Sequence, residues 1–303
     1  MKIAISGATG LIGSALKAFL LRNGHEVDEI SRHRGRGLHK SQIFWNPDED
    51  YIDIAALEGH DVIVHLAGSN ISVQSWSATY KKEILSSRVK STKLLVDTIQ
   101  KMNKRPKIFF CASAVGYYGN QDPYLKINER SLAGQGFLPK VCQEWENASA
   151  DLILYGVRLV HMRFGIVLSK KGGALAKMLP LFYFGLGGRW GLGHQKMSWI
   201  ALEEIGSIVE FIMSRDGING PVNFTSPNSV TNREFTKILG KVIFRPTLLP
   251  VPAFVIRWLF GEMGQAFLLD GCDAIPEVLQ KAGYQFNYPD LRGALQQIIK
   301  SGR

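Results

Sequence analysis

Short apolar runs alternate with longer amphipathic stretches through the first half of the chain. The run Lys2–Ser6 predicts a buried strand, Leu11–Arg22 a helix, and Glu26–Ile30 a second strand. The same patterns predict further strands over Asp61–Val64, Lys107–Cys111 and Val157–Arg163, and helices over Lys81–Lys101 and Leu138–Leu154. This alternation is typical of an α/β protein with a doubly wound parallel sheet of the Rossmann type.

Beyond Phe164 the alternation loosens into a glycine-rich stretch over residues 185–193. A helix over Leu202–Met213 and a strand over Pro221–Phe224 then return to the sheet pattern. We therefore predict a Rossmann domain over residues 1–168, with its sheet completed by residues 200–226. Residues 169–303 are expected to supply substrate-side segments and a smaller, mostly helical C-terminal domain over about 247–303, which Pro246–Pro252 opens.

The most apolar stretch near the end of the chain is Val251–Leu269. It carries Arg257 and Glu262, and two charges in that length favour an amphipathic packed helix over a membrane crossing. The apolar run after Met1 and Lys2 resembles a signal peptide, but it contains regularly spaced glycines and lacks a convincing cleavage site. We therefore expect no membrane partner.

Three glycines follow the first predicted strand and open the first predicted helix. A glycine turn lets the backbone approach a pyrophosphate, and a helix N-terminus offers unpaired N–H groups and a positive dipole end. The alternative is a glycine-rich turn without a ligand. The strand–loop–helix context favours a dinucleotide site, formed by Gly7, Thr9, Gly10, Leu11, Ile12 and Gly13.

The end of the second predicted strand indicates which dinucleotide binds. An acidic residue there accepts from the ribose 2′-hydroxyl of NAD, whereas a cation pairs with the 2′-phosphate of NADP. Ser31 stands at the acidic position and Arg32 follows it, with Arg34 and Arg36 close behind. We predict NADP, held by Ser31 and Arg32, over the alternative of a solvated basic loop.

Charge and cysteine content narrow the class of partner. The 303 residues carry a formal net charge of +10, but the basic residues are mostly scattered and no nucleic-acid-binding motif accompanies them. A nucleotide is therefore favoured over nucleic acid. The three cysteines are widely spaced and the histidines lack metal-ligand spacing, so we predict no disulfide framework and no metal site. Reduced thiols indicate a cytoplasmic protein.

Several motifs resemble the extended short-chain dehydrogenase/reductase superfamily. His65-Leu66-Ala67-Gly68 resembles its adenosine and ribose segment, and Arg88–Thr92 stands where Asn-Val-x-Gly-Thr is usual. Ser113–Gly119 resembles the catalytic-serine segment with one inserted residue, and Phe164-Gly165 resembles the segment beside the nicotinamide. Over nearly the whole chain the pattern is similar to the epimerase family protein group, family 39U of that superfamily. The resemblance implies NADP and cofactor contacts from His65, Leu66, Ala67, Gly68, Arg88, Cys142, Phe164 and Gly165.

The resemblance also implies a departure from the usual catalytic pattern. Enzymes of this superfamily use Tyr-x-x-x-Lys, in which the tyrosine is the acid/base and the lysine lowers its pKa and holds the nicotinamide ribose. No tyrosine here has a lysine four residues later. Aligning Glu146 with the glutamate that follows the lysine puts Cys142 at the lysine position and Leu138 at the tyrosine position. A leucine cannot transfer a proton.

The remaining candidates each have a plainer alternative. Ser113 is expected to bond a substrate carbonyl or hydroxyl, or else to be a strand-end hydroxyl satisfied by the backbone. Tyr117 replaces the missing phenol or is a packed aromatic. Arg88 binds a phosphate or is a helix-surface charge, and Cys142 is otherwise a small buried residue. Stacking on a base or sugar, with core packing as the default, is considered for Trp76, Trp190 and Trp199.

Two functions stay open on these grounds. The first is an NADP-dependent oxidoreductase or epimerase acting on a small or nucleotide-linked substrate, with Ser113 and Tyr117 as catalytic residues. The second is a non-catalytic NADP-binding sensor or regulatory protein on the same fold. The missing Tyr and Lys favour the second, while Ser113 and the glycine-rich segment favour the first. Neither the substrate nor the oligomeric state follows from the sequence.

Overall fold

The computed structural model of the chain describes residues 1–33 and 42–300. In this part of the chain, the main sheet has eight strands in the order β12-β8-β6-β5-β1-β2-β3-β4. Neighbouring strands are parallel, except that β3 and β4 are antiparallel. The strands are β1 (Lys2–Ser6), β2 (Glu26–Ser31), β3 (Gln42–Asn46), β4 (Tyr51–Ile52), β5 (Val62–His65), β6 (Ile108–Ala114), β8 (Arg158–Phe164) and β12 (Gly220–Phe224).

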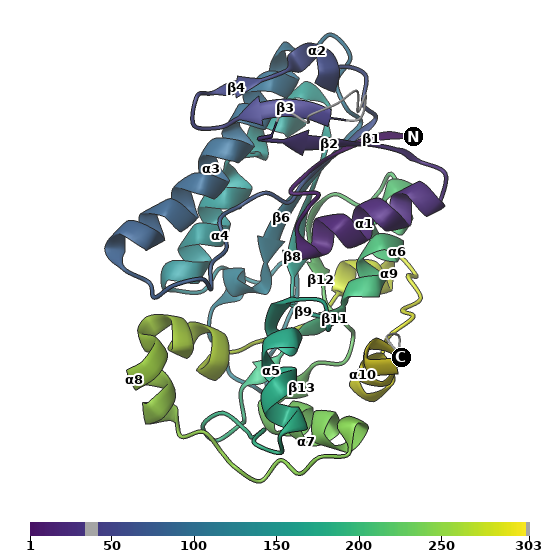
Figure 1. Cartoon of the computed structure of the whole chain (residues 1–303). Helices are drawn as coiled ribbons and strands as arrows, with labels where there is room; N and C mark the ends of the chain where they lie inside the picture. The colour runs from purple at the N-terminus through teal and green to yellow at the C-terminus, as the bar shows by residue number, and fades with distance from the viewer. Residues whose placement is uncertain (34–41, 301–303) are drawn as a thin grey trace.

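Helices cover both faces of this sheet (Figure 1). Helices α3 (Ala78–Lys101) and α4 (Phe137–Asn147) lie on one face, and α1 (Leu11–Arg22) and α6 (Leu202–Met213) on the other. The strands between them are almost fully buried, because a parallel sheet covered on both faces has no side in water. The predicted Rossmann-type doubly wound fold is confirmed.

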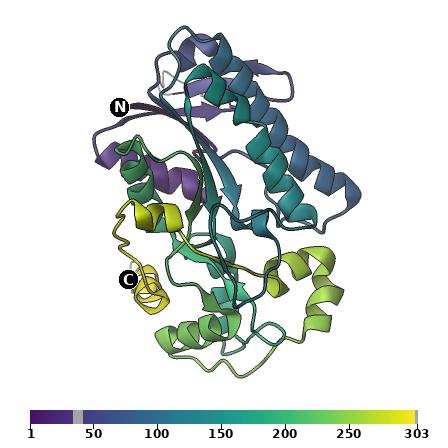
Figure 2. The ribbon, with the colours of Figure 1, turned by 180° about the vertical axis from the view of Figure 1, so that it is seen from behind.

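A second group of elements lies below the sheet in the view of Figure 1, and the view from behind shows the same two tiers (Figure 2). Strands β6 and β8 point toward it. It contains α5 (Gly173–Tyr183), α7 (Asn232–Ile243), α8 (Ala253–Gly264), α10 (Leu291–Lys300) and two short sheets, β9 (Ile166–Leu168) with β11 (Trp199–Ala201) and β10 (Lys196–Met197) with β13 (Val230–Thr231). Helices α5, α7 and α10 and the short strands share a second apolar core that includes Phe182, Trp199 and Phe235.

The C-terminal segments also return to the Rossmann part. Strand β14 (Asp273–Ala274) pairs in parallel with β7 (Lys126–Ile127), which follows β6 in the chain. The short helix α9 (Glu277–Lys281) follows β14, and α2 (Ile54–Leu57) lies on the other side of the molecule beside β3. Because the two tiers are joined this closely, the domain boundary at residue 168 stays a prediction.

The predicted continuous helix over Leu138–Leu154 is wrong at its C-terminal end. Helix α4 ends at Asn147, and a 3-10 helix, η2, follows over Ala150–Tyr155. The Ser149 side chain explains the break, because its hydroxyl donates to the Glu146 carbonyl and also hydrogen-bonds His161 Nε2. A serine that bonds the preceding turn in this way competes with the regular helical ladder.

The expected packed helix over Val251–Leu269 is also wrong. Helix α8 is interrupted at Gly261, whose φ of 55° is not helical, and a π-helix, η3, follows over Gln265–Leu269. Phe254 and Trp258 are 70% and 83% exposed although Ile256 is buried, so much of the apolar surface of α8 does not pack on the protein. None of the helices in the described ranges combines the length and apolar character needed to cross a membrane.

Candidate functional site

The loop between β1 and α1 has the geometry of an anion site. Gly7 adopts φ +71°, and a Cβ there would lie 3.0 Å from the backbone of Leu66 and Ala67. A Cβ at Gly13 would lie only 2.2 Å from the Gly7 oxygen, so the helix and loop are in backbone contact. Helix α1 begins after Gly10 without a side-chain cap. Its first N–H groups are therefore available to a phosphate.

The end of β2 places Ser31 and Arg32 beside this loop. Arg32 is exposed, and Ser31 Oγ accepts from the backbone N–H of His33. The two acidic residues nearest them on β2 are already paired: Asp28 lies 2.9 Å from His60 Nε2, and Glu29 pairs with Lys17. The two carboxylates nearest the C-terminal end of β2 are therefore already paired, and Glu26 lies at the other end of the strand. Arg34 and Arg36 lie outside the described residues.

His65 is a buried support beneath the loop after β5. Its two ring nitrogens hydrogen-bond Ser6 Oγ at 2.6 Å and Ser91 Oγ at 3.2 Å, which joins β1, β5 and α3. Burial, with a smaller contribution from the charge of Arg88, lowers the pKa of His65 to about 3, so the ring is neutral. Leu66 and Ala67, which follow it, form the wall opposite Gly7.

Arg88 reaches from α3 toward the end of β5. Its Nη1 donates to the carbonyls of Ser69 at 3.1 Å and Ile84 at 3.0 Å, and its guanidinium lies over the Trp145 ring at 4.9 Å. A Cβ on Gly68 would lie 3.3 Å from Arg88 Cγ. The alternative that Arg88 is a helix-surface charge is therefore wrong.

Ser113 ends β6 beside a buried ion pair. Arg163 on β8 makes two 2.8 Å bonds to the Glu146 carboxylate on α4, one from Nε and one from Nη2. The Ser113 hydroxyl donates to Glu146 Oε1 at 2.7 Å, so its partner is a carboxylate and not the backbone. Burial raises the pKa of Glu146, but the Arg163 bonds and charge outweigh it and leave that pKa below its usual value.

Tyr117 and Tyr118 follow in a 3-10 turn, η1 (Val115–Tyr118), and differ in their surroundings. The Tyr118 hydroxyl is buried, donates to Asn223 Oδ1 and accepts from Arg163 Nη1. The Tyr117 ring lies 3.6 Å from the Arg163 guanidinium, while its hydroxyl bonds none of the described residues. Tyr117 is thus packed through its ring and still has a hydroxyl available to a ligand.

Leu138 and Cys142 face the same turn from α4. A Cβ on Gly116 would lie 3.5 Å from Leu138 Cβ and 3.9 Å from Cys142 Sγ. Cys142 is buried, and burial raises the pKa of its thiol to about 11, so the thiol is neutral. Lys140 is exposed on another face of the helix. No side chain of α4 therefore brings a cation to the end of β6.

The segment after β8 is shaped mainly by packing. The Phe164 ring lies against Phe224 at 5.1 Å, and a Cβ on Gly165 would lie 2.6 Å from the Ser198 oxygen. The glycine is required because β11 approaches so closely. Contact of Phe164 and Gly165 with a nicotinamide stays a prediction.

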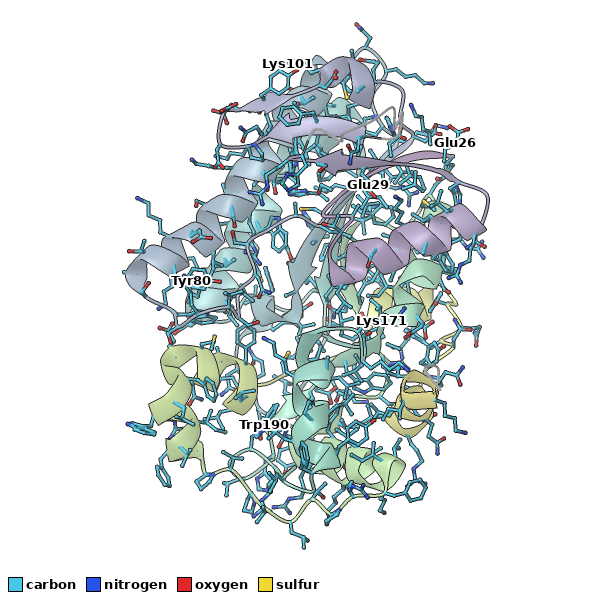
Figure 3. All side chains as sticks on the ribbon, viewed as in Figure 1. Glu26, Glu29, Tyr80, Lys101, Lys171 and Trp190 are labelled. Carbon is cyan, nitrogen blue, oxygen red and sulfur yellow. The ribbon has the colours of Figure 1, made fainter. Side chains whose placement is uncertain are left out.

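The tryptophans mostly have packing roles. Trp199 is fully buried, and its indole N–H donates to the Asn228 carbonyl, so it cannot stack on a ligand. Trp76 packs edge-on against Phe137 and Phe267. Trp190 is half-buried and lies in the lower tier, on the opposite side of Lys171 from Glu29 (Figure 3).

Sequence reasoning missed a second buried carboxylate near this site. Glu129 Oε1 accepts from the backbone N–H groups of Asn223 and Val278, while Oε2 has no partner among the described residues. Burial raises the pKa of Glu129. It lies in a loop without periodicity, and its partners come from distant segments. No local pattern could therefore have revealed it.

Comparisons with known proteins place this geometry in a family. Residues 3–140 match the "NAD dependent epimerase/dehydratase family", and residues 251–298 match a "domain of unknown function". An "epimerase family protein" of Mycobacterium leprae is 40% identical over 97% of this chain and 94% of its own length.

Two solved structures extend the comparison. The crystal structure of the human epimerase family protein SDR39U1 with NADPH matches 99% of this chain and all of that chain, at 34% identity and a TM-score of 0.90. A UDP-glucose 4-epimerase of Thermotoga maritima, solved with UDP-glucose, matches 99% of this chain and 97% of that chain with a TM-score of 0.77. It is only 16% identical, so that likeness shows the fold alone.

Proposed function

The chain belongs to the family of epimerase family proteins related to NAD-dependent epimerases and dehydratases, and from this premise we propose that it is an NADP(H)-dependent oxidoreductase or epimerase. The observation that carries the proposal is the glycine loop with an uncapped helix N-terminus, beside the end of β2, where Arg32 is exposed and the nearest described carboxylates, Asp28 and Glu29, are paired. The NADPH in the human relative supports the same cofactor. The three buried free thiols fit a cytoplasmic location.

The residues present fit a dinucleotide. Gly10 is exposed at the start of α1, and a Cβ there would approach only the Gly7 oxygen, at 3.3 Å. The space above it is therefore kept free of side chains, as a pyrophosphate requires. We assign the pyrophosphate to Gly7–Gly13, the 2′-phosphate to Ser31 and Arg32, and the ribose and nicotinamide to the ends of β5, β6 and β8. When bound, NADPH would supply the hydride.

Ser113 and Tyr117 are the proposed catalytic residues. Because the Ser113 hydroxyl donates to Glu146, its oxygen is directed to accept, which suits a substrate hydroxyl better than a carbonyl. Tyr117 has the free hydroxyl of the pair and can donate a proton to a substrate oxygen. We propose a small substrate with a carbonyl or secondary hydroxyl, and nucleotide-linked sugars are the first class to test.

A second candidate function is an NADP-binding sensor without turnover. It is favoured by Leu138 and Cys142, which bring a hydrocarbon and a neutral thiol to the turn after Ser113. Leucine has no proton to donate, and a neutral thiol does not supply the positive charge that the usual lysine brings to the site. The two functions share the cofactor site and differ only in chemistry.

Single-turnover NADPH oxidation distinguishes these two functions. In the wild type we expect slow NADPH oxidation with carbonyl compounds and slow NADP⁺ reduction with nucleotide sugars that carry secondary hydroxyls, because a positioned proton donor or acceptor contributes about 10²–10⁴-fold. Ser113→Ala and Tyr117→Phe should each reduce the rate further without changing NADPH affinity. Tyr124→Phe, at a 94% exposed site, is the matched control. Rapid turnover that neither substitution affects would place the catalytic centre elsewhere, and no turnover with any substrate would favour the sensor.

Cofactor choice is tested at Arg32. A charge-assisted bond to the 2′-phosphate is worth about 1.5–3 kcal/mol, so Arg32→Ala should weaken NADPH binding roughly ten- to a hundred-fold and leave NADH binding unchanged. Titration calorimetry with both nucleotides measures the difference. Equal weakening of both would show that Arg32 does not contact the 2′-phosphate.

A further inference from the structure

Arg88 is a largely buried cation without a carboxylate partner in the described part of the chain. The contrast with Arg163 is direct, because Arg163 is neutralised by two bonds to Glu146. The fixed acceptors of Arg88 are the two backbone carbonyls at its Nη1. A charge taken out of water is costly unless it is paired and hydrogen-bonded. An anionic ligand would supply the counter-charge and the hydrogen bonds that this arginine lacks in the protein.

The rest of the guanidinium is available for such a ligand. Arginine has five N–H donors, and those on Nε and Nη2 of Arg88 bond none of the described residues. Neither nitrogen is among the fully enclosed polar atoms that lack a partner. Gly68, which lies against the Arg88 side chain, is exposed. The free donors are therefore open to the space in front of the β5 loop.

The guanidinium is also fixed before a ligand arrives. It lies over the Trp145 ring, and the Trp145 indole N–H donates to Thr92 Oγ1 at 3.1 Å, which holds the ring in place. The two carbonyls at Nη1 set the orientation of the planar group. Because the guanidinium is already oriented, it loses little conformational entropy when its N–H donors bind a phosphate or a pair of hydroxyls.

The position of Arg88 beside the end of β5 indicates which part of the dinucleotide it would contact. The strand order runs from β2 through β1 and β5 to β6. Arg32 follows β2 on one side of the phosphate loop, whereas Arg88 contacts Gly68 after β5 and lies near Cys142, on the other side. A dinucleotide with its 2′-phosphate at Arg32 and its pyrophosphate on α1 extends its nicotinamide half toward Arg88.

We infer that Arg88 binds the nicotinamide half of the dinucleotide, through the ribose hydroxyls or the phosphate beside them, and supplies the cation that α4 lacks at Cys142. The inference rests on the proposed cofactor but not on turnover. It also fits the glycine at position 68, because a Cβ there would lie 3.4 Å from Arg88 Cζ.

Half-ligands test the inference. Titration calorimetry would compare NADPH, NADH and 2′,5′-ADP, which lacks the nicotinamide half, on the wild type, Arg88→Met and Arg32→Ala. We expect Arg88→Met to weaken NADPH and NADH equally, by roughly ten- to a hundred-fold, and to leave 2′,5′-ADP unchanged. Arg32→Ala should give the opposite pattern, with NADPH and 2′,5′-ADP weakened and NADH unchanged. If Arg88→Met yields too little folded protein, Arg88→Lys keeps the charge without the fork and should give the same pattern with a smaller loss.

The outcomes separate this inference from the proposed function. Unchanged NADPH affinity in Arg88→Met would overturn the inference. An equal loss of affinity for 2′,5′-ADP would also overturn it, because that is the result expected if Arg88 only holds α3 against the loop after β5. A wild type that binds neither NADPH nor 2′,5′-ADP would overturn the cofactor assignment, and this inference with it. A wild type that binds both but oxidises no substrate would remove only the enzymatic function, and the Arg88 pattern would still stand.

Discussion

Gly13→Val is expected to abolish NADPH binding and to lower the melting temperature of the protein. The Cβ of any residue at this position would lie 2.2 Å from the Gly7 oxygen and 2.8 Å from Ala8 Cα, and both atoms belong to the backbone. Neither can move without displacing the phosphate loop from α1. A backbone shift of this kind removes the N–H groups that a pyrophosphate needs and also disrupts the core contact of β1. Thermal unfolding with and without NADPH measures both losses.

Two other glycines provide the controls for Gly13. Gly217→Ala should change neither property, because nothing lies within 4 Å of a Cβ at that position. Gly10→Ala should weaken NADPH binding without lowering the melting temperature. Its Cβ would approach only the Gly7 oxygen, at 3.3 Å, so the fold tolerates the methyl group while the space for the pyrophosphate is reduced. Normal NADPH binding by Gly13→Val with an unchanged melting temperature would contradict the assignment of the phosphate loop.

The sequence predicted the elements of the Rossmann part well because each carries a strong local signal. The buried strand Lys2–Ser6 and the helices Leu11–Arg22 and Leu202–Met213 have the predicted bounds. The errors arose where a contact from a distant segment decides the outcome. Ser149 ends α4 early partly through His161 on β8, and the exposed apolar face of α8 could not be distinguished from a packed one by periodicity.

The candidate site was predictable only as a set of positions. The glycine spacing and the Ser31-Arg32 pair indicate where a dinucleotide binds, because they depend on neighbours in the chain. What the side chains do depends on partners far away in sequence. Ser113 was expected to meet a substrate or the backbone, but it donates to Glu146, which Arg163 holds in place. The sequence allows two roles for Arg88, and its position over Trp145 excludes the helix-surface charge.

Arg163→Leu is expected to destabilise the protein by about 3–5 kcal/mol, because it leaves the Glu146 carboxylate buried without its counter-ion. The substitution also removes the Arg163 N–H that donates to the Tyr118 hydroxyl and the guanidinium that packs on the Tyr117 ring. Denaturant unfolding at neutral pH measures the loss. Lys281→Ala is the matched control, since its pair with Glu277 is an exposed helical one worth about 0.3–0.5 kcal/mol. A loss as small as that of the control would show that the buried pair contributes nothing net.

The same pair predicts how stability changes in acid. Burial alone would raise the pKa of Glu146, but the Arg163 bonds hold it below the usual value of 4.5, so the folded state favours the carboxylate. A carboxyl whose pKa is lowered by folding contributes stability above its unfolded pKa, and that contribution is lost as the pH falls through the folded pKa. The stability difference between the wild type and Glu146→Gln should therefore be largest at neutral pH and shrink below about pH 4.5. Unfolding in denaturant at a series of pH values measures this difference. If it is the same at pH 3 as at pH 7, then the charge of Glu146 does not stabilise the fold.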